Sequence, residues 1–190
     1  MNVTLPATDA RTRILDAVER IVLARGVAGL TLEAAAREAG VSKGGLLYHF
    51  ASKEALLTGL LERLAAFIRA EFDKNCARQP DGPGRVARAF LSWAFGEADC
   101  SPGDEHHDRA AAVFLAAFHH DPALLDPMRA VYGGMKAALM ADGVPPGKAM
   151  TVLAACDGMF MAQMFGLYRP TEDELSALRA TLETLLEVKP

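Results

Sequence analysis

The chain has 190 residues, of which 51% are hydrophobic and 23% are charged, and its formal net charge is −4. This composition allows a substantial core in one or two domains, and the three widely spaced cysteines imply neither a disulfide framework nor a zinc ribbon. No segment reaches ~18 uninterrupted apolar residues, and the first ten residues lack the apolar run typical of a secretory leader. We therefore expect a cytoplasmic protein without a leader or a membrane span. Alanine and leucine dominate and no alternating apolar pattern persists, which predicts an all-α fold.

The first predicted helix runs from Asp9 to Arg25, where apolar residues recur at a helical spacing, and Gly26 ends it. A short helix at 32–39 follows and ends at Gly40. A residue just past a helix often takes the left-handed conformation, which costs glycine least. Val41 then fills the space between this helix and the next.

Ser42 is the predicted N-cap of the third helix, whose first turn is Lys43, Gly44 and Gly45. Two glycines in a first turn cost a helix roughly 1 kcal/mol each relative to alanine. Close approach of the backbone to a phosphate or a base edge would offset that cost, because helix N-termini favour anions. The pattern indicates a helix-turn-helix, whose second helix enters the major groove of DNA. The alternative is a Schellman turn between two ordinary packed helices.

The run AAAREAGVSKGGLLYHFASKEALL resembles the DNA-binding domain of TetR-type repressors, and the match extends from Thr8 to Ile68, about a third of the chain. The resemblance implies a nine-helix, all-α TetR-like fold. It implies a three-helix helix-turn-helix domain at 8–55 with its recognition motif at 31–50, and a ligand-binding and dimerisation domain at 56–190. It also implies a DNA-binding regulator and not an enzyme.

Carried over position by position, the resemblance implies that nine residues contact DNA: Thr31, Ser42, Lys43, Gly44, Gly45, Leu47, Tyr48, His49 and Lys53. Leu47 departs from the family, which usually has tyrosine there. A leucine cannot hydrogen-bond a phosphate, so it would press on a thymine methyl or simply pack. Other readings stay open: Lys43 contacts any phosphate instead of guanine, Tyr48 packs at an interface, and His49 caps its helix as a cation.

The charge is unevenly divided along the chain. Residues 1–55 carry seven Lys/Arg and six Asp/Glu, a net of +1, whereas residues 56–190 carry thirteen and eighteen, a net of −5. The first part is far from strongly basic. DNA binding must therefore depend on a few well-placed donors and on two subunits rather than on a wide positive patch.

Ser52 is the predicted cap of a longer helix, which follows Phe50 without a flexible linker. Further helices are predicted at 85–98, 109–119, 121–141, 147–168 and 171–188, nine in all. The helix at 147–168 is apolar nearly all round, and the one at 171–188 has a leucine stripe. We expect these last two helices to form a four-helix homodimer interface, the alternative being that they close the core of a monomer.

Aromatic and methionine side chains in the second part are candidates for a broad apolar effector site, although such residues at helical spacing are more often plain core. The candidates are Phe90, Trp93, Phe114, Phe118, Met135, Asp157, Phe160, Met161 and Met164. Asp157 is the only acid in the helix at 147–168. A buried carboxylate needs a partner, for which a cationic ligand, a partner chain and solvent are the options.

Two histidine pairs, His106-His107 and His119-His120, raise the question of a metal. One helix between them would hold them ~16–18 Å apart, too far for one site, so we predict no metal and no cofactor. We expect a repressor that binds a pseudo-palindromic double-stranded DNA operator as a homodimer and is released by a small hydrophobic effector, with cations among the candidates. A helical-bundle metalloprotein and a ligand-binding bundle without DNA binding are the alternatives.

Overall fold

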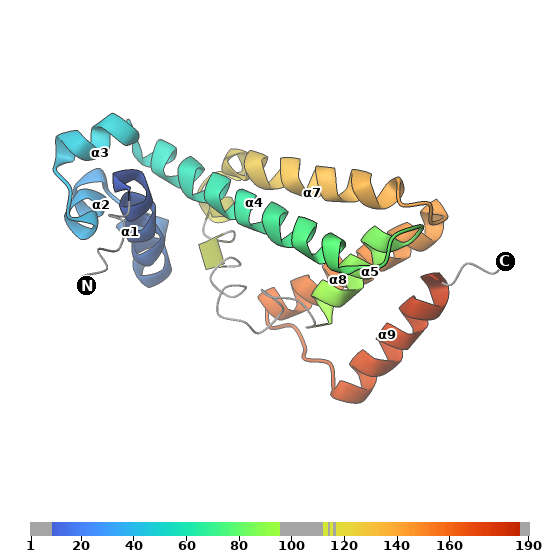
Figure 1. The fold of residues 1–190 in the computed structure, drawn as a ribbon. Coiled ribbons are helices and arrows are strands. Elements are labelled where there is room, and N and C mark those ends of the chain that lie inside the picture. The colour runs from blue at the N-terminus through green and yellow to red at the C-terminus, as the bar shows by residue number, and fades with distance from the viewer. Residues whose placement is uncertain (1–8, 96–111, 114, 116, 187–190) are drawn as a thin grey trace, which may run out of the picture. The chain divides into compact units, whose positions relative to one another are not determined.

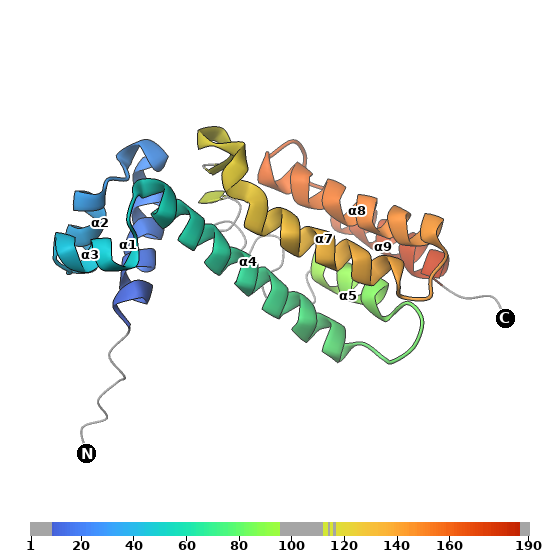
Figure 2. The same cartoon turned by 90° about the horizontal axis from the view of Figure 1, so that it is seen from above.

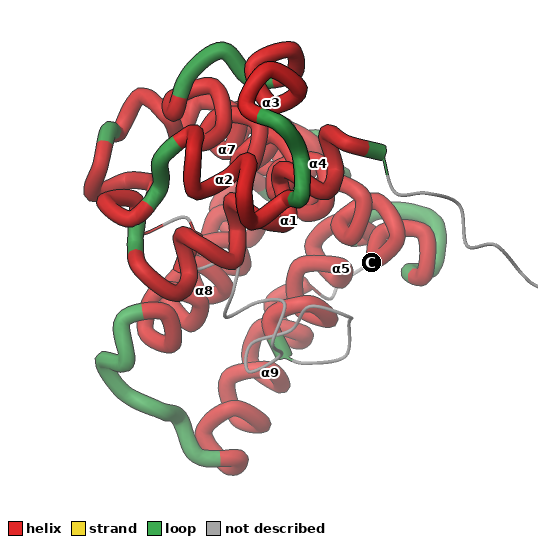
Figure 3. Tube along the Cα trace, turned by 90° about the vertical axis from the view of Figure 1, so that its left-hand side faces the viewer, coloured by secondary structure: helices red, strands yellow, loops and turns green. Residues whose placement is uncertain are grey.

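The computed structural model describes residues 9–95, 112–113, 115 and 117–186, without the side chains of 163 and 164. All regular structure in these residues is helical (Figure 3), as the all-α prediction required. The helices, labelled in Figure 1, are α1 (Ala10–Arg25), η1 (Val27–Gly29), α2 (Leu32–Ala39), α3 (Lys43–His49), α4 (Lys53–Arg78), α5 (Arg85–Ala94), η2 (Pro122–Leu125), α7 (Asp126–Met140), α8 (Pro146–Met164) and α9 (Glu172–Leu186). Residues 112–113, 115 and 117–120 are also helical, so this helix runs one residue past the predicted end at 119.

The chain forms two compact units. Among the described residues, the first unit contains 9–64 and those between 112 and 128. The second unit contains 65–95 and 129–186. Helices α4 and α7 each contribute to both units. The boundary drawn from the sequence, between residues 55 and 56, stays a prediction.

The first unit is built on α1, α2 and α3, which pack against one another (Figure 1). The predicted apolar stripe of α1 is buried, and the alanines of α2 allow close approach between the helices. The beginning of α4 packs closely too. A Cβ added at Gly59 would lie 2.7 Å from Cε1 of the buried Phe50, so only glycine fits at this crossing.

In the second unit α5 packs on α8 and α9, which also contact each other (Figure 2). The Phe72 ring of α4 lies 5.6 Å from the Phe90 ring of α5, and both are buried. Gly84 stands at the N-cap of α5 and has no side chain to offer. The Asp142 carboxylate, beyond the end of α7, takes that role by accepting a hydrogen bond from the backbone N–H of Ala87 at 2.9 Å.

Two predicted helices have different bounds from those expected. α8 ends at Met164, four residues before the predicted end at Tyr168, because Gly166 takes a left-handed φ of 61°. The helix predicted from Asp121 begins as the 3-10 helix η2, where the Asp121 carboxylate accepts a hydrogen bond from the N–H of Ala123. None of the described helices combines the length and apolar character needed to cross a membrane.

Candidate nucleic-acid interface and effector residues

The turn between α2 and α3 has the geometry that the sequence predicts. Gly40 lies in the left-handed region, with φ 65° and ψ 35°, and the N–H of Val41 donates to the Ala36 carbonyl at 3.0 Å. Ser42 Oγ accepts a hydrogen bond from the N–H of Gly45 at 3.0 Å. Thr31 Oγ1 caps α2 in the same way, on the N–H of Ala34. The predicted N-cap Ser42 is therefore confirmed, and Thr31 is a second N-cap.

One face of α3 is anchored and the other is open. Leu46 is fully buried, whereas the whole first turn from Ser42 to Gly45 is exposed. Tyr48 is 85% exposed, and its ring meets the His49 ring edge-on at 5.1 Å. Leu47 is also exposed. Because the exposed side chains follow one another along a short, well-anchored helix, they form a surface that a flat or grooved partner can reach.

The two glycines of the first turn differ in what they do for the fold. A Cβ at Gly45 would lie 3.2 Å from Ser42 Oγ, so a side chain there would crowd the cap. A Cβ at Gly44 would meet nothing within 4 Å, and Gly44 does not have a positive φ. Packing and backbone conformation among the described residues therefore give no reason for glycine at this position.

Lys43, in the exposed first turn of α3, is paired with an acid of the neighbouring helix α2. Lys43 Nζ lies 2.6 Å from Glu33 Oε1, and the two side chains are 59% and 62% exposed. The hydrogen bond from Lys43 lowers the pKa of Glu33. Lys53, at the start of α4, is half-buried. Ser52 caps α4 as predicted, accepting a hydrogen bond from the N–H of Ala55 at 3.1 Å.

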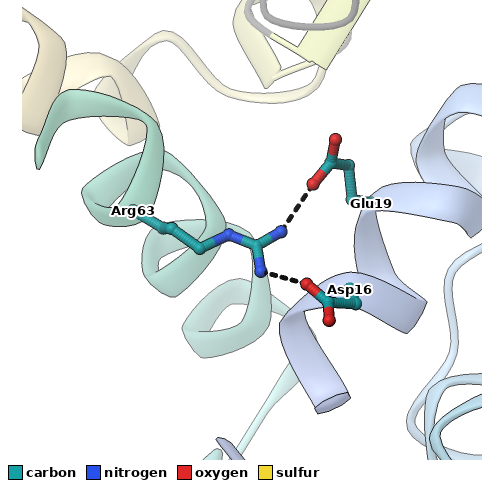
Figure 4. Close-up of polar contacts among 3 residues, drawn as sticks. All are labelled: Asp16, Glu19 and Arg63. Carbon is teal, nitrogen blue, oxygen red and sulfur yellow. Dashed lines mark hydrogen bonds and ion pairs between the residues drawn. The ribbon is translucent and has the colours of Figure 1, made fainter. Parts of the chain in front are cut away.

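α4 is tied to α1 by a forked ion pair. Arg63 reaches from α4 between Asp16 and Glu19, which lie one turn apart on α1 (Figure 4). Arg11 of α1 lies with its guanidinium 5.4 Å from the centre of the Phe50 ring. These contacts position the three-helix unit on the first part of α4.

The structure distributes the predicted effector residues unevenly. Phe90 and Met135 are buried, Trp93 and Phe160 are half-buried, and Met161 and Phe118 are exposed. Phe118 belongs to the first unit and the other five to the second. Phe114 and the side chain of Met164 lie outside the described residues. Burial of Phe90 and Met135 agrees with a plain core role as well as with an effector site.

Asp157 lies on the exposed side of α8, where partial desolvation of its carboxylate raises its pKa. The adjacent Cys156 is buried, and its Sγ lies 3.7 Å from the Phe90 carbonyl oxygen, to which it donates. Burial and the nearby Asp157 raise the pKa of the Cys156 thiol to about 12. α8 therefore holds a buried, unreactive thiol against the backbone of α5, and an acid follows it directly in the sequence.

Sequence reasoning missed Asn75. It is 1% exposed, and neither its amide nitrogen nor its amide oxygen has a hydrogen-bond partner among the described residues. Asn75 follows the buried Ile68 and Phe72 at helical spacing, so an amide interrupts the core stripe of α4. The sequence does contain a signal for Asn75, because it is a polar residue at a position where the helical repeat of α4 calls for an apolar one.

In the part of the chain that the structure describes, no three His, Cys, Asp or Glu residues lie close enough to hold a metal ion. His119 and His120 are exposed, and His106 and His107 lie outside the described residues.

Sequence profiles of known families match both parts of the chain. Residues 14–60 match the family described as bacterial regulatory proteins, tetR family, and residues 84–187, more than half of the chain, match the tetracyclin repressor-like C-terminal domain. The chain belongs to the TetR family of transcriptional regulators. Members of this family are DNA-binding regulators and not enzymes, and the metalloprotein alternative is not favoured.

Two curated relatives match this TetR-family chain over different lengths. It is 41% identical over 58 residues to the transcriptional regulator TtgR of Pseudomonas putida, a match that spans 30% of this chain and 28% of TtgR. It is 24% identical over 159 residues to BetI of Burkholderia thailandensis, covering 80% of each.

Among solved structures, the multidrug binding protein EbrR in complex with malachite green is 28% identical to this TetR-family chain, with a TM-score of 0.66. The match covers 94% of this chain and 98% of EbrR. EbrR in complex with ethidium matches with a TM-score of 0.63 at the same identity. The similarity to EbrR therefore extends over both matched domains.

Proposed function

We propose that this TetR-family regulator is a repressor that binds a pseudo-palindromic operator as a homodimer and leaves it when a small hydrophobic effector binds. In this proposal α3 of each subunit enters the major groove. The nine residues predicted from the sequence, from Thr31 to Lys53, contact phosphates and base edges. Effector binding in the second unit favours a conformation of α4 that changes the spacing of the two recognition helices.

Gly44 carries the DNA-binding proposal. A glycine in the first turn of an exposed helix is unfavourable by about 1 kcal/mol relative to alanine. In the part of the chain that the structure describes, no contact and no φ value requires it. An approach of the α3 backbone to a phosphate or base edge, closer than a Cβ would permit, supplies a reason. The open tip from Ser42 to Gly45 and the outward Tyr48 fit the same docking.

The dimer proposal is supported by the faces of α8 and α9. Met150, Met161 and Phe165 are exposed large apolar residues on or next to α8. α9 carries a leucine stripe of which Leu182 alone is fully buried among the described residues. A second copy packed about a two-fold axis would cover these side chains and bring two recognition helices to two half-sites.

The effector proposal starts from EbrR, which binds malachite green and ethidium. Both dyes are aromatic cations. In this chain, Asp157 on α8 supplies a carboxylate, and Phe90 on the neighbouring α5 supplies an aromatic group. Asn75 offers an amide donor and an acceptor to a polar group of an effector. We therefore propose that hydrophobic cations are among the effectors.

Fluorescence anisotropy with labelled DNA from upstream of the protein's own gene tests the proposal. We expect binding by the wild-type dimer, release by malachite green, and a clear loss of affinity for Lys43→Ala with the dimer intact by size-exclusion chromatography. DNA with dye and without protein is the control for the dye. Unchanged affinity of Lys43→Ala at moderate salt would contradict the docking, and absence of any DNA binding would favour the ligand-binding bundle.

A further inference from the structure

Glu33 shares the DNA-facing tip with the cation that this tip depends on. Lys43 is the only lysine or arginine between Ser42 and Phe50. Its Nζ is 2.6 Å from Glu33 Oε1, and both side chains are more than half exposed. The pair joins the first turn of α2 to the first turn of α3. Wherever Lys43 docks on DNA, the carboxylate of Glu33 therefore comes close to the same spot.

A carboxylate at this place weakens binding to DNA phosphates in two ways. It neutralises the lysine that would displace a counterion, and its own charge is repelled by the backbone. An exposed ion pair is weak, so a good partner on DNA can separate Lys43 from Glu33. Glu33 then needs a hydrogen-bond donor on the DNA, and phosphates offer none.

The major-groove edge of a G·C pair matches the Lys43–Glu33 pair. Guanine presents two acceptors, N7 and O6, to which lysine donates, and cytosine presents the N4 amino group, from which a glutamate accepts. The 2.6 Å between the two side chains means that a donor and an acceptor are offered side by side.

We propose that Glu33 is a specificity-determining residue of this regulator: it accepts a hydrogen bond from cytosine N4 beside the guanine bound by Lys43, and it repels DNA that offers no such donor. This inference rests on the proposed binding of α3 to DNA. It makes Glu33 a contact residue that the family resemblance did not supply, and it assigns Lys43 a base in place of a phosphate.

Glu38 provides a matched control. It lies on the same helix as Glu33, is exposed, and pairs with Arg20 of α1 at 3.0 Å. Glu33→Gln and Glu38→Gln thus remove the same charge from α2, but only the first frees Lys43. Thermal unfolding of both variants checks that they stay folded.

The test measures binding to a random-sequence duplex and to an operator selected from a random pool by the wild-type protein. We expect the operator to contain a G·C pair whose replacement weakens wild-type binding about tenfold. Glu33→Ala, which has no acceptor for cytosine N4, should lose most of that discrimination. Glu33→Gln should also bind the random duplex about three- to tenfold more tightly, with a steeper salt dependence because Lys43 is free to contact a phosphate.

Glu38→Gln should keep the wild-type base preference. If Glu33→Gln and Glu38→Gln behave alike, or if Glu33→Ala keeps the wild-type base preference, the role of Glu33 is overturned. If the wild-type protein binds neither duplex, the proposed DNA-binding function itself fails.

Discussion

Arg63 of α4 and Asp16 of α1 form a hydrogen-bonded ion pair of 2.5 Å, although they are 47 residues apart in the chain (Figure 4). The other terminal nitrogen of the same guanidinium binds Glu19. The Arg63 side chain is only 30% exposed, so solvent screens this fork less than it screens an isolated surface pair. Through this contact a movement of the first part of α4 acts directly on α1.

Replacement of Arg63 should therefore weaken the attachment of α1 to α4. We expect Arg63→Met to lower the free energy of unfolding by about 1 kcal/mol, and by less at high salt. Arg69→Met is the matched control, because Arg69 of the same helix pairs with Asp73 four residues on, in an exposed pair. Urea unfolding of both variants measures the difference. If both variants lose the same free energy of unfolding, the Arg63 fork contributes no more to stability than an exposed ion pair does.

Gly44 and Gly45 should respond differently to alanine. Gly44→Ala should raise the free energy of unfolding by about 0.5–1 kcal/mol, since alanine favours the helix and its Cβ meets no atom. It should at the same time reduce DNA affinity. Gly45→Ala should gain less stability, because its Cβ crowds Ser42 Oγ. Urea unfolding and anisotropy on the same samples measure both effects, and a more stable Gly44→Ala with full DNA affinity would remove the main support for close backbone approach.

Asn75→Leu should make the protein more stable. An unpaired buried amide costs about 1–3 kcal/mol, and leucine of similar size continues the stripe of Ile68 and Phe72. Thermal unfolding without effector measures the gain. Asn75→Ala is the comparison, because it removes the amide but leaves a cavity, so it should gain less or lose stability. A loss of stability with leucine would show that the amide is paired in solution.

Asp157 should make stability fall with rising pH. Its pKa is raised in the folded protein from the ordinary value of 3.8 because burial penalises the charged carboxylate. The folded chain thus holds this proton more tightly than the unfolded chain does. Stability falls between 3.8 and the raised value, and it stays reduced above that window. Asp157→Asn should be more stable than wild type at neutral pH by at most about 1 kcal/mol, since the exposed side chain is partly screened.

Urea titrations of wild type and Asp157→Asn across this range check the sign. The difference between the two proteins should shrink as the pH falls from the raised pKa to 3.8, and it should be small below 3.8. A difference that is independent of pH would assign the stabilisation to something other than the carboxylate charge.

The helix-turn-helix was predictable because its signals are local. Gly40 and Ser42 act on residues within a few positions of themselves, so their types and spacing predict both the turn and the cap. The end of α8 was not predicted correctly, because apolar residues continue past Gly166 and only its backbone conformation reveals the stop. Apolar periodicity measures the tendency to be buried, not where the helix ends.

The remaining site residues depend on contacts between distant segments. The pairing of Lys43 with Glu33 requires the packing of two helices, and the burial of Asn75 depends on what lies against α4. The effector candidates were chosen by residue type, which does not separate a core residue such as Met135 from an exposed one such as Met161.

The borrowed cap of α5 bears on how the chain is made. Ala87 leaves the ribosome 55 residues before Asp142, whose carboxylate accepts its hydrogen bond. Gly84 stands at the N-cap of α5 but has no side chain that could accept this bond in the meantime. The nascent chain must therefore carry the first turn of α5 with this backbone N–H open to water until α7 has been synthesised. The cap of α5 can therefore be completed only after residue 142 has been synthesised, which ties this part of the second unit to a late stage of translation.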